Sequence, residues 1–158
     1  MKGCILPWNH IFGSLSGKFH LCCHAEWEAQ PLVLGDSTQS ISDIWNGDPL
    51  KKVRKQFLAG DIPTVCKKVC YDRELIGIKS NRMSVNERFK QQKYLQDKTQ
   101  DDGSLLTTPT YLDIRFGNLC NFKCRMCGPE SSTSWYKDSE LPYSKTIDPY
   151  TKNEALWE

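Results

Sequence analysis

Three cysteines, Cys120, Cys124 and Cys127, follow one another in the segment CNFKCRMC with gaps of three and then two residues. Thiolates are the usual ligands of iron–sulfur clusters, and each of the four irons in a 4Fe–4S cube needs a terminal ligand. A loop that offers three thiolates leaves one iron open to bind another molecule. Gly117 and Gly128 flank the loop and allow sharp turns at both ends. The spacing therefore predicts a 4Fe–4S site with one open position.

A strand and a helix are expected on the two sides of this loop. Residues 110–116, TYLDIRF, are rich in the aromatic and branched side chains that suit a strand. A helix is expected to begin near Ser131. The polar, glycine-containing segment 96–109 predicts a linker, and we expect a domain boundary there.

The segment LDIRFGNLCNFKCRMCGP closely resembles the signature of radical S-adenosylmethionine (SAM) enzymes. The resemblance implies that Cys120, Cys124 and Cys127 bind a 4Fe–4S cluster whose open iron is chelated by the amino and carboxylate groups of SAM. It also implies that one electron cleaves SAM to methionine and a 5′-deoxyadenosyl radical, which abstracts hydrogen from a substrate. The family often has an aromatic residue just before the third cysteine, where this chain has Met126.

A zinc site is the alternative interpretation of the three thiols, with a distant residue as the fourth ligand. Zinc-ribbon knuckles usually have two residues between their cysteines, so the three-residue gap after Cys120 fits them poorly. The expected strand before the loop and helix after it instead match the start of a β/α barrel.

The five other cysteines lie in the first 70 residues, and the chain of 158 residues has eight in total. Either disulfides or metal ligation could account for them. The N-terminus has no apolar stretch typical of a secretory signal, because Trp8, Asn9 and His10 come too early. A reducing compartment disfavours disulfides. We therefore expect metal ligation in a cytoplasmic protein.

These five cysteines and their surroundings resemble the auxiliary-cluster module of radical SAM enzymes, called SPASM in its larger form and twitch in its shorter form. The resemblance rests on LPWNHIFGSLSGKFHLCC and ISDIWNGDPLKKVRKQFLAGDIPTVCKKVCYDREL. Only four or five thiols are present, which suits one cluster and favours the twitch form. The resemblance implies one auxiliary 4Fe–4S cluster with the ligands Cys4, Cys22, Cys66 and Cys70.

Cys22 and Cys23 are adjacent, and either could be the ligand. We choose Cys22 because it satisfies the spacing of Gly17, four residues and a cysteine. Cys23 is then expected to be a buried thiol without a ligand role. The chain also has His10, His20 and His24, which we expect to be core or surface residues. Three tryptophans are expected in the core: Trp8, Trp27 and Trp45.

A β-hairpin is predicted near the N-terminus. Strand-like residues at 5–6, 11–12 and 19–21 lie on the two sides of a turn at Ser14–Gly17. Pairing across this turn would bring Cys4 toward Cys22.

Helices are predicted in the middle of the chain. Ser40 is a capping residue for a short helix, and Asp48, followed by proline, is the expected cap of a second helix that ends at Gly60. Residues 66–70, CKKVC, are expected to form a loop. A further helix is predicted from Ser84 to about Leu95.

The predicted fold class is α+β: a small cysteine-rich twitch/SPASM-like domain of a β-hairpin plus helices, followed by the first βα unit of a truncated radical SAM β/α barrel. The expected divisions are an auxiliary domain at 1–80, a helix and linker at 81–108, and the start of the barrel at 109–158. A complete barrel needs about 200 residues or more. We therefore expect a fragment, or one of two chains that share a barrel, with an isolated first strand and poor packing beyond Leu105.

The predicted function is reductive cleavage of SAM for hydrogen abstraction from an unknown substrate, a peptide or a small molecule. An electron donor such as a flavodoxin or a ferredoxin is implied by the resemblance. The alternative is a non-catalytic binding module stabilised by zinc or an iron–sulfur cluster. The net charge of +2 gives no reason to expect a nucleic-acid partner, and no segment approaches the about 20 apolar residues that would cross a membrane.

Overall fold

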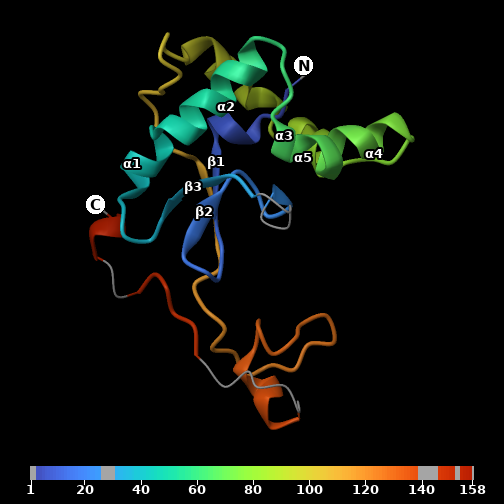
Figure 1. Cartoon of the computed structure of the whole chain (residues 1–158), viewed down its shortest axis with the longest axis vertical. Helices are drawn as coiled ribbons and strands as arrows, with labels where there is room; N and C mark the ends of the chain where they lie inside the picture. The colour runs from blue at the N-terminus through green and yellow to red at the C-terminus, as the bar shows by residue number, and fades with distance from the viewer. Residues whose placement is uncertain (1–2, 26–30, 139–145, 152–153, 158) are drawn as a thin grey trace.

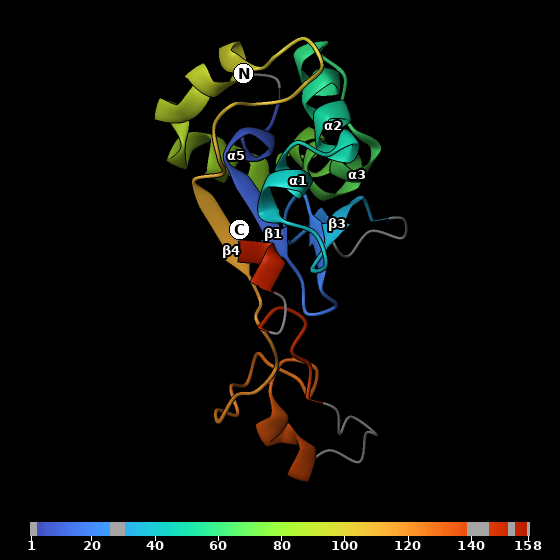
Figure 2. The same cartoon turned by 90° about the vertical axis from the view of Figure 1, so that its left-hand side faces the viewer.

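The computed structural model of the protein describes residues 3–25, 31–138, 146–151 and 154–157. Its centre is a mixed sheet of four strands in the order β3–β2–β1–β4 (Figures 1 and 2). The strands are β1 (His10–Gly13), β2 (Lys18–His20), β3 (Val33–Asp36) and β4 (Tyr111–Ile114). Strands β1, β2 and β3 pair antiparallel, whereas β4 pairs parallel to β1. With helices around the sheet, the predicted α+β class is confirmed.

The predicted hairpin is confirmed as β1 and β2. Its turn is closed by the Ser14 N–H, which donates to the Lys18 carbonyl at 2.9 Å, and Gly17 has a φ of +78°, a conformation that suits glycine. The strand expected at residues 5–6 is wrong. Pro7 lies in the first turn of a short 3-10 helix, η1 (Leu6–Trp8), because a proline fits that position better than a strand.

Two helices follow β3, namely α1 (Ile41–Trp45) and α2 (Asp48–Leu58). The Ser40 hydroxyl caps α1 as predicted, accepting from the Asp43 N–H at 3.1 Å. The cap predicted for the second helix is off by one residue, because Gly47 occupies the cap position and Asp48 is the first helical residue. Helix α2 ends just before Gly60, whose φ is +85°.

The segment 66–70, which was predicted to be a loop, is helical. A continuous run consists of α3 (Thr64–Cys66), a π-helical turn η3 (Lys67–Tyr71) and α4 (Asp72–Leu75). The run has neither glycine nor proline between Pro63 and Gly77, so nothing interrupts it.

Helix α5 (Asn81–Arg88) begins three residues before the predicted start at Ser84. Its cap is Ser80, whose hydroxyl accepts from the Met83 N–H at 3.2 Å, whereas the Ser84 hydroxyl donates to the Ser80 carbonyl at 3.3 Å. The chain then continues as a 3-10 helix, η4 (Lys90–Lys98), rather than as an α-helix to Leu95.

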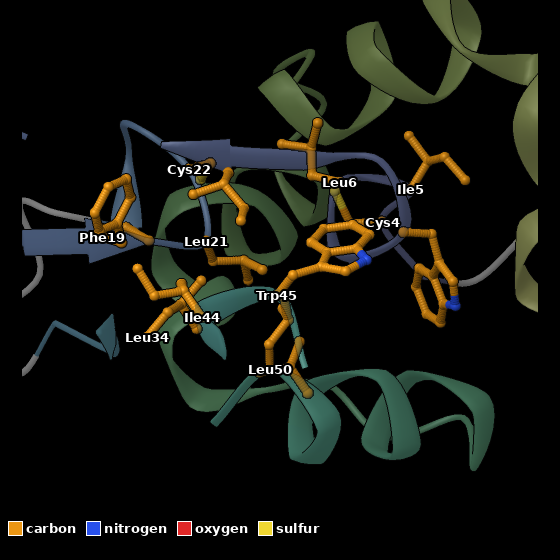
Figure 3. Close-up of a cluster of buried hydrophobic side chains, with 14 of the residues drawn as sticks. Cys4, Ile5, Leu6, Phe19, Leu21, Cys22, Leu34, Ile44, Trp45 and Leu50 are labelled. Atoms are coloured by element: carbon orange, nitrogen blue, oxygen red, sulfur yellow. The ribbon is translucent and has the colours of Figure 1, made fainter. Parts of the chain in front are cut away.

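The main core lies between the sheet and helices α1 and α2. Figure 3 shows Leu21, Leu34 and Ile44 gathered between the strands and the helices. Trp8 and Trp45 are buried as predicted, and Trp27 lies outside the described residues. His10 and His20 are also buried, and each places Nδ1 3.2 Å from a backbone carbonyl, whereas His24 is exposed.

The expectation of an isolated strand after the linker is wrong. Each residue of β4 has a partner in β1, from His10 opposite Tyr111 to Gly13 opposite Ile114. The segment before β4 is also attached, because Leu105 is buried and the Trp45 Nε1 donates to the Thr107 carbonyl at 2.5 Å. The division at residues 80 and 108 stays a prediction.

The described residues contain no complete βα unit of a barrel. Strand β4 leads into the three-cysteine loop and then into a short 3-10 helix, η5 (Thr133–Lys137), where an α-helix was expected. In both views this region extends from the end of the sheet away from α2 and α5 (Figures 1 and 2). Packing beyond Leu105 is uneven, with Phe116 and Leu119 exposed.

The last described segments return to the sheet. Tyr150 is buried, donates its hydroxyl to the Ser14 carbonyl and packs edge-on against Phe19. A final 3-10 helix, η6 (Glu154–Trp157), buries Leu156. Across the described ranges, no helix combines the length and apolar character that crossing a membrane requires.

Candidate metal centre

Four of the five N-terminal thiols converge although they come from three separate parts of the chain. Cys4 precedes η1, and Cys22 follows β2. Cys66 ends α3 and Cys70 lies in the π-helical turn η3. Such π-helical turns are rare in proteins, but those that occur often lie at functional sites.

These four cysteines line a single small cavity of about 20 Å³. All four are buried. The rest of the wall is largely apolar and includes Leu6, Leu21, Ala25 and Val69, together with the polar residues Asn81 and Arg82. The structure therefore brings together the four thiols predicted as auxiliary-cluster ligands.

Burial strongly disfavours ionisation of the Cys4, Cys22 and Cys66 thiols. It raises the pKa of Cys4 to about 12 and that of Cys22 to about 11, and it raises the pKa of Cys66 further still. Neighbouring thiols add to the effect, since the charges of Cys22 and Cys70 also raise the pKa of Cys4. Without metal, Cys4, Cys22 and Cys66 are neutral thiols at pH 7. Metal binding must therefore release protons.

The donor set fits an iron–sulfur cluster. Soft thiolates select zinc or iron–sulfur clusters among the common metals. Yet, within the described ranges, no three histidine, cysteine or acidic side chains are placed to share one metal ion. Four cysteines line the cavity, and a 4Fe–4S cube takes four thiolates, one for each iron.

Cys23, unlike Cys22, lies outside the cavity and close to Asp113 and Arg115. It is half-buried and is absent from the residues that line the cavity. Burial raises its pKa, and so does the charge of Asp113 beside β1, while Arg115 lowers it. The placement agrees with the choice of Cys22 over Cys23, and the ligand assignment itself stays a prediction.

The other predicted site, the three-cysteine loop, lies at the opposite end of the sheet from α5 (Figures 1 and 2). Cys120 and Cys127 are half-buried, and Cys124 is exposed. The Cys127 N–H donates to the Cys124 carbonyl at 2.9 Å, which closes a turn within the loop. The three thiols therefore share one loop, and at least one of them is accessible to an outside molecule.

Hydroxyl groups from the following segment hold the backbone of this loop. Ser134 donates to the Cys120 carbonyl at 2.7 Å, and Ser132 donates to the Phe122 carbonyl at 2.7 Å. These contacts were missed by sequence reasoning, although the run of serine and threonine at 131–134 is the kind of signal that could have indicated them.

Asn118, at the start of the loop, forms hydrogen bonds with two other segments. Its Oδ1 accepts from the Ile147 N–H at 2.8 Å, and its Nδ2 donates to the Tyr136 hydroxyl at 2.8 Å. Gly117 is required beside it, because a Cβ there would stand 2.5 Å from the Ile147 carbonyl oxygen. The structure thus gives Gly117 a steric reason, the close approach of Ile147, whereas the sharp turn predicted at Gly117 is not seen at this residue.

Comparison with known protein families gives one match, which covers residues 4–71 and is described as SPASM, an iron–sulfur cluster-binding domain. The matched residues include all four thiols that line the cavity. No radical SAM core is detected in the chain, and no curated protein and no solved structure matches it.

Residues 4–71 are therefore a cysteine-rich SPASM domain, and its cysteines bind an iron–sulfur cluster. SPASM domains occur in radical SAM enzymes. The resemblance noted from the sequence is thus supported for the auxiliary module.

Proposed function

We propose that the chain is part of a radical SAM protein with two 4Fe–4S clusters. The auxiliary cluster is held by Cys4, Cys22, Cys66 and Cys70, and the second by the three-cysteine loop. The observation that carries this proposal is the SPASM match at 4–71 in the same chain as the three-cysteine loop, since SPASM domains occur in radical SAM enzymes.

Each cysteine set has a distinct task in this proposal. When bound, SAM and the second cluster supply the one-electron cleavage that yields a 5′-deoxyadenosyl radical. Cys120, Cys124 and Cys127 hold three of the four irons and leave one position for SAM. The Ser132 and Ser134 hydroxyls hold the loop backbone, so that its sulfurs keep their relative positions. The buried thiols near Cys4 keep the auxiliary cluster away from water.

The substrate class we propose is a peptide or a small molecule, with an electron donor such as a flavodoxin or a ferredoxin. The exposed position of Cys124 supports access by both SAM and a donor.

Anaerobic reconstitution with iron and sulfide tests the proposal. The chain should bind about eight irons, four per cluster, and become brown. Replacement of Cys120, Cys124 and Cys127 together by alanine should remove about half of the iron, and replacement of the four cavity cysteines should remove the other half. Stoichiometric zinc and no visible absorption in the natively purified protein would contradict it.

A non-catalytic, metal-stabilised binding module is the second candidate. It is favoured by the lack of a complete βα unit in the described ranges. Reductive cleavage of SAM by the reconstituted chain, measured as release of 5′-deoxyadenosine, would exclude this candidate. If iron binds at both cysteine sets but no 5′-deoxyadenosine is released, even when a chain that completes the barrel is added, the non-catalytic candidate is favoured.

A further inference from the structure

The backbone on both sides of Cys4 is held by one side chain of helix α5. The Asn86 Oδ1 accepts from the Ile5 N–H at 2.9 Å, and the Asn86 Nδ2 donates to the Gly3 carbonyl at 2.9 Å. Both bonds connect residues more than 80 positions apart. The amide of Asn86 thus brackets Cys4 and restricts where its thiol can lie.

Arg82 lies one helical turn before Asn86 and reaches the same segment. Its Nη1 donates to the Gly3 carbonyl at 3.3 Å, and its guanidinium lies 4.5 Å from the centre of the Tyr71 ring. Arg82 also lines the cavity that the four cysteines surround. Residues four apart share one face of a helix, so α5 presents both side chains to the cluster site.

An ion pair fixes the position of the Arg82 guanidinium. Its Nε donates to Glu74 Oε1 at 2.9 Å, and its Nη2 donates to the other carboxylate oxygen. The side chains of this pair are 13% and 16% exposed, so water screens the charge of Arg82 weakly. Arg82 lines the cavity that Cys4 and Cys66 also line, whereas Glu74 does not, so the positive end of the ion pair faces the cluster site.

Helix α5 lies beyond the residues matched by the SPASM family, which end at 71. We propose that α5 is nevertheless a working part of the auxiliary-cluster site, in which Asn86 positions Cys4 and Arg82 supplies a fixed positive charge that favours the reduced cluster. This inference rests on the proposal that Cys4 and the three other cavity cysteines bind the cluster. Asn86 and Arg82 are both positioning residues, since neither is a ligand of the cluster.

The physical reason for the Arg82 effect is charge balance. One-electron reduction adds a negative charge to a cluster that is already surrounded by thiolates. A nearby cation stabilises the more negative state, so it raises the reduction potential, and charge and hydrogen bonding around a cluster are known determinants of that potential. Removal of the cation should lower it.

The first experiment measures the midpoint potential of the auxiliary cluster in the full chain, with Cys120, Cys124 and Cys127 replaced by alanine so that one cluster remains. A titration followed by EPR compares Arg82→Gln, Arg82→Lys and the control Arg73→Gln, which changes an exposed arginine on α4. We expect Arg82→Gln to disfavour reduction about tenfold, or about 59 mV for one electron. Arg82→Lys, which keeps the charge, should restore most of the potential, and Arg73→Gln should leave it unchanged.

The second experiment measures how fast iron is lost to a chelator. Asn86→Ala removes both bonds around Cys4, and we expect iron loss at least fivefold faster with little change in potential. Met83→Ala on the same helix is the control, because Met83 is exposed. Equal rates for the two variants would overturn the role of Asn86.

The results separate this inference from the proposed function. Absence of iron from the unsubstituted cavity cysteines would refute the cluster assignment itself. A full iron load in Arg82→Gln with an unchanged potential would refute the charge effect alone. If Arg82→Gln does not fold, Arg82→Met removes the charge instead: a potential lower by about 59 mV supports the charge effect, and an unchanged potential overturns it.

Discussion

Ile11 of β1 and Leu112 of β4 lie opposite each other in a parallel ladder. Strand β4, which leads into the three-cysteine loop, is therefore an edge strand of the sheet. The β1–β2 hairpin of the same sheet leads into Cys22. Both cysteine sets are attached to one sheet, at opposite ends (Figures 1 and 2). A shift of β4 along β1 would move one set relative to the other.

Cys22 and Cys23 should differ in their effect on iron binding. We expect Cys22→Ser to lose most of the auxiliary iron, because Cys22 lines the cavity, and Cys23→Ser to keep it, because Cys23 does not. Iron and sulfide per chain, measured with the three loop cysteines replaced by alanine, give the answer. The reverse order would make Cys23 the ligand.

In the metal-free protein, thiol alkylation should depend strongly on position and pH. Cys124 is exposed and should react with iodoacetamide first. Cys22, with a pKa of about 11, is ionised in about one molecule in a thousand at pH 8, and Cys4, with a pKa of about 12, in fewer. Because the thiolate is the nucleophile, their rates should rise about tenfold per pH unit between pH 8 and 10.

Peptide mass spectrometry measures this modification at each cysteine. In denaturant the differences should disappear, since burial is their cause. Equal rates at Cys22 and Cys124 in the folded protein at pH 8 are not compatible with the buried site.

Arg54 should contribute to stability through buried hydrogen bonds. Its Nε donates to the Pro7 carbonyl at 2.8 Å, its Nη1 donates to the Gly103 carbonyl at 3.1 Å, and its guanidinium lies 4.3 Å from the centre of the Trp45 ring. Arg54→Met leaves two carbonyls unpaired, and we expect the free energy of unfolding to fall by about 3 kcal/mol. Urea unfolding followed by circular dichroism measures the change.

Lys52→Met is the matched control for Arg54, because Lys52 is exposed on the same helix. Its effect should stay within about 0.5 kcal/mol. Similar losses for the two variants would mean that the helix as a whole, rather than the hydrogen bonds of Arg54, causes the change.

Two glycines with positive φ should respond differently to alanine. Gly60 has a φ of +85° and open space around it, so Gly60→Ala should cost about 1 kcal/mol from the backbone alone. Gly103 has a φ of +92°, and a Cβ there would stand 2.7 Å from the Lys51 carbonyl oxygen, so Gly103→Ala should cost clearly more. Thermal unfolding of both variants tests the order, and equal costs would rule out the close approach to Lys51.

Asn118 should hold the three-cysteine loop in place. Asn118→Ala removes its bonds to Ile147 and Tyr136, and we expect faster cleavage between residues 119 and 127 in limited proteolysis. Asn121→Ala in the same loop is the control, because Asn121 is exposed. Unchanged cleavage in Asn118→Ala would show that the hydroxyls of Ser132 and Ser134 suffice.

Much of the local structure follows from neighbouring residues. The turn at Ser14–Gly17 and the cap at Ser40 were predicted because each depends on side chains within a few positions. The helical form of residues 66–70 was missed, because two cysteines with lysines between them carry no clear periodicity and the packing around the cavity decides their conformation.

The sequence by itself determined the two cysteine sets and predicted their chemistry, because thiol type and spacing are properties of the chain. Only the tertiary structure decided that β4 pairs with β1, since parallel partners about 100 residues apart leave no local signal. It alone decided that Asn86 brackets Cys4, because such contacts join residues more than 80 positions apart and depend on how α5 packs. Donor chemistry is local, whereas the cavity that gathers the donors is made by long-range packing.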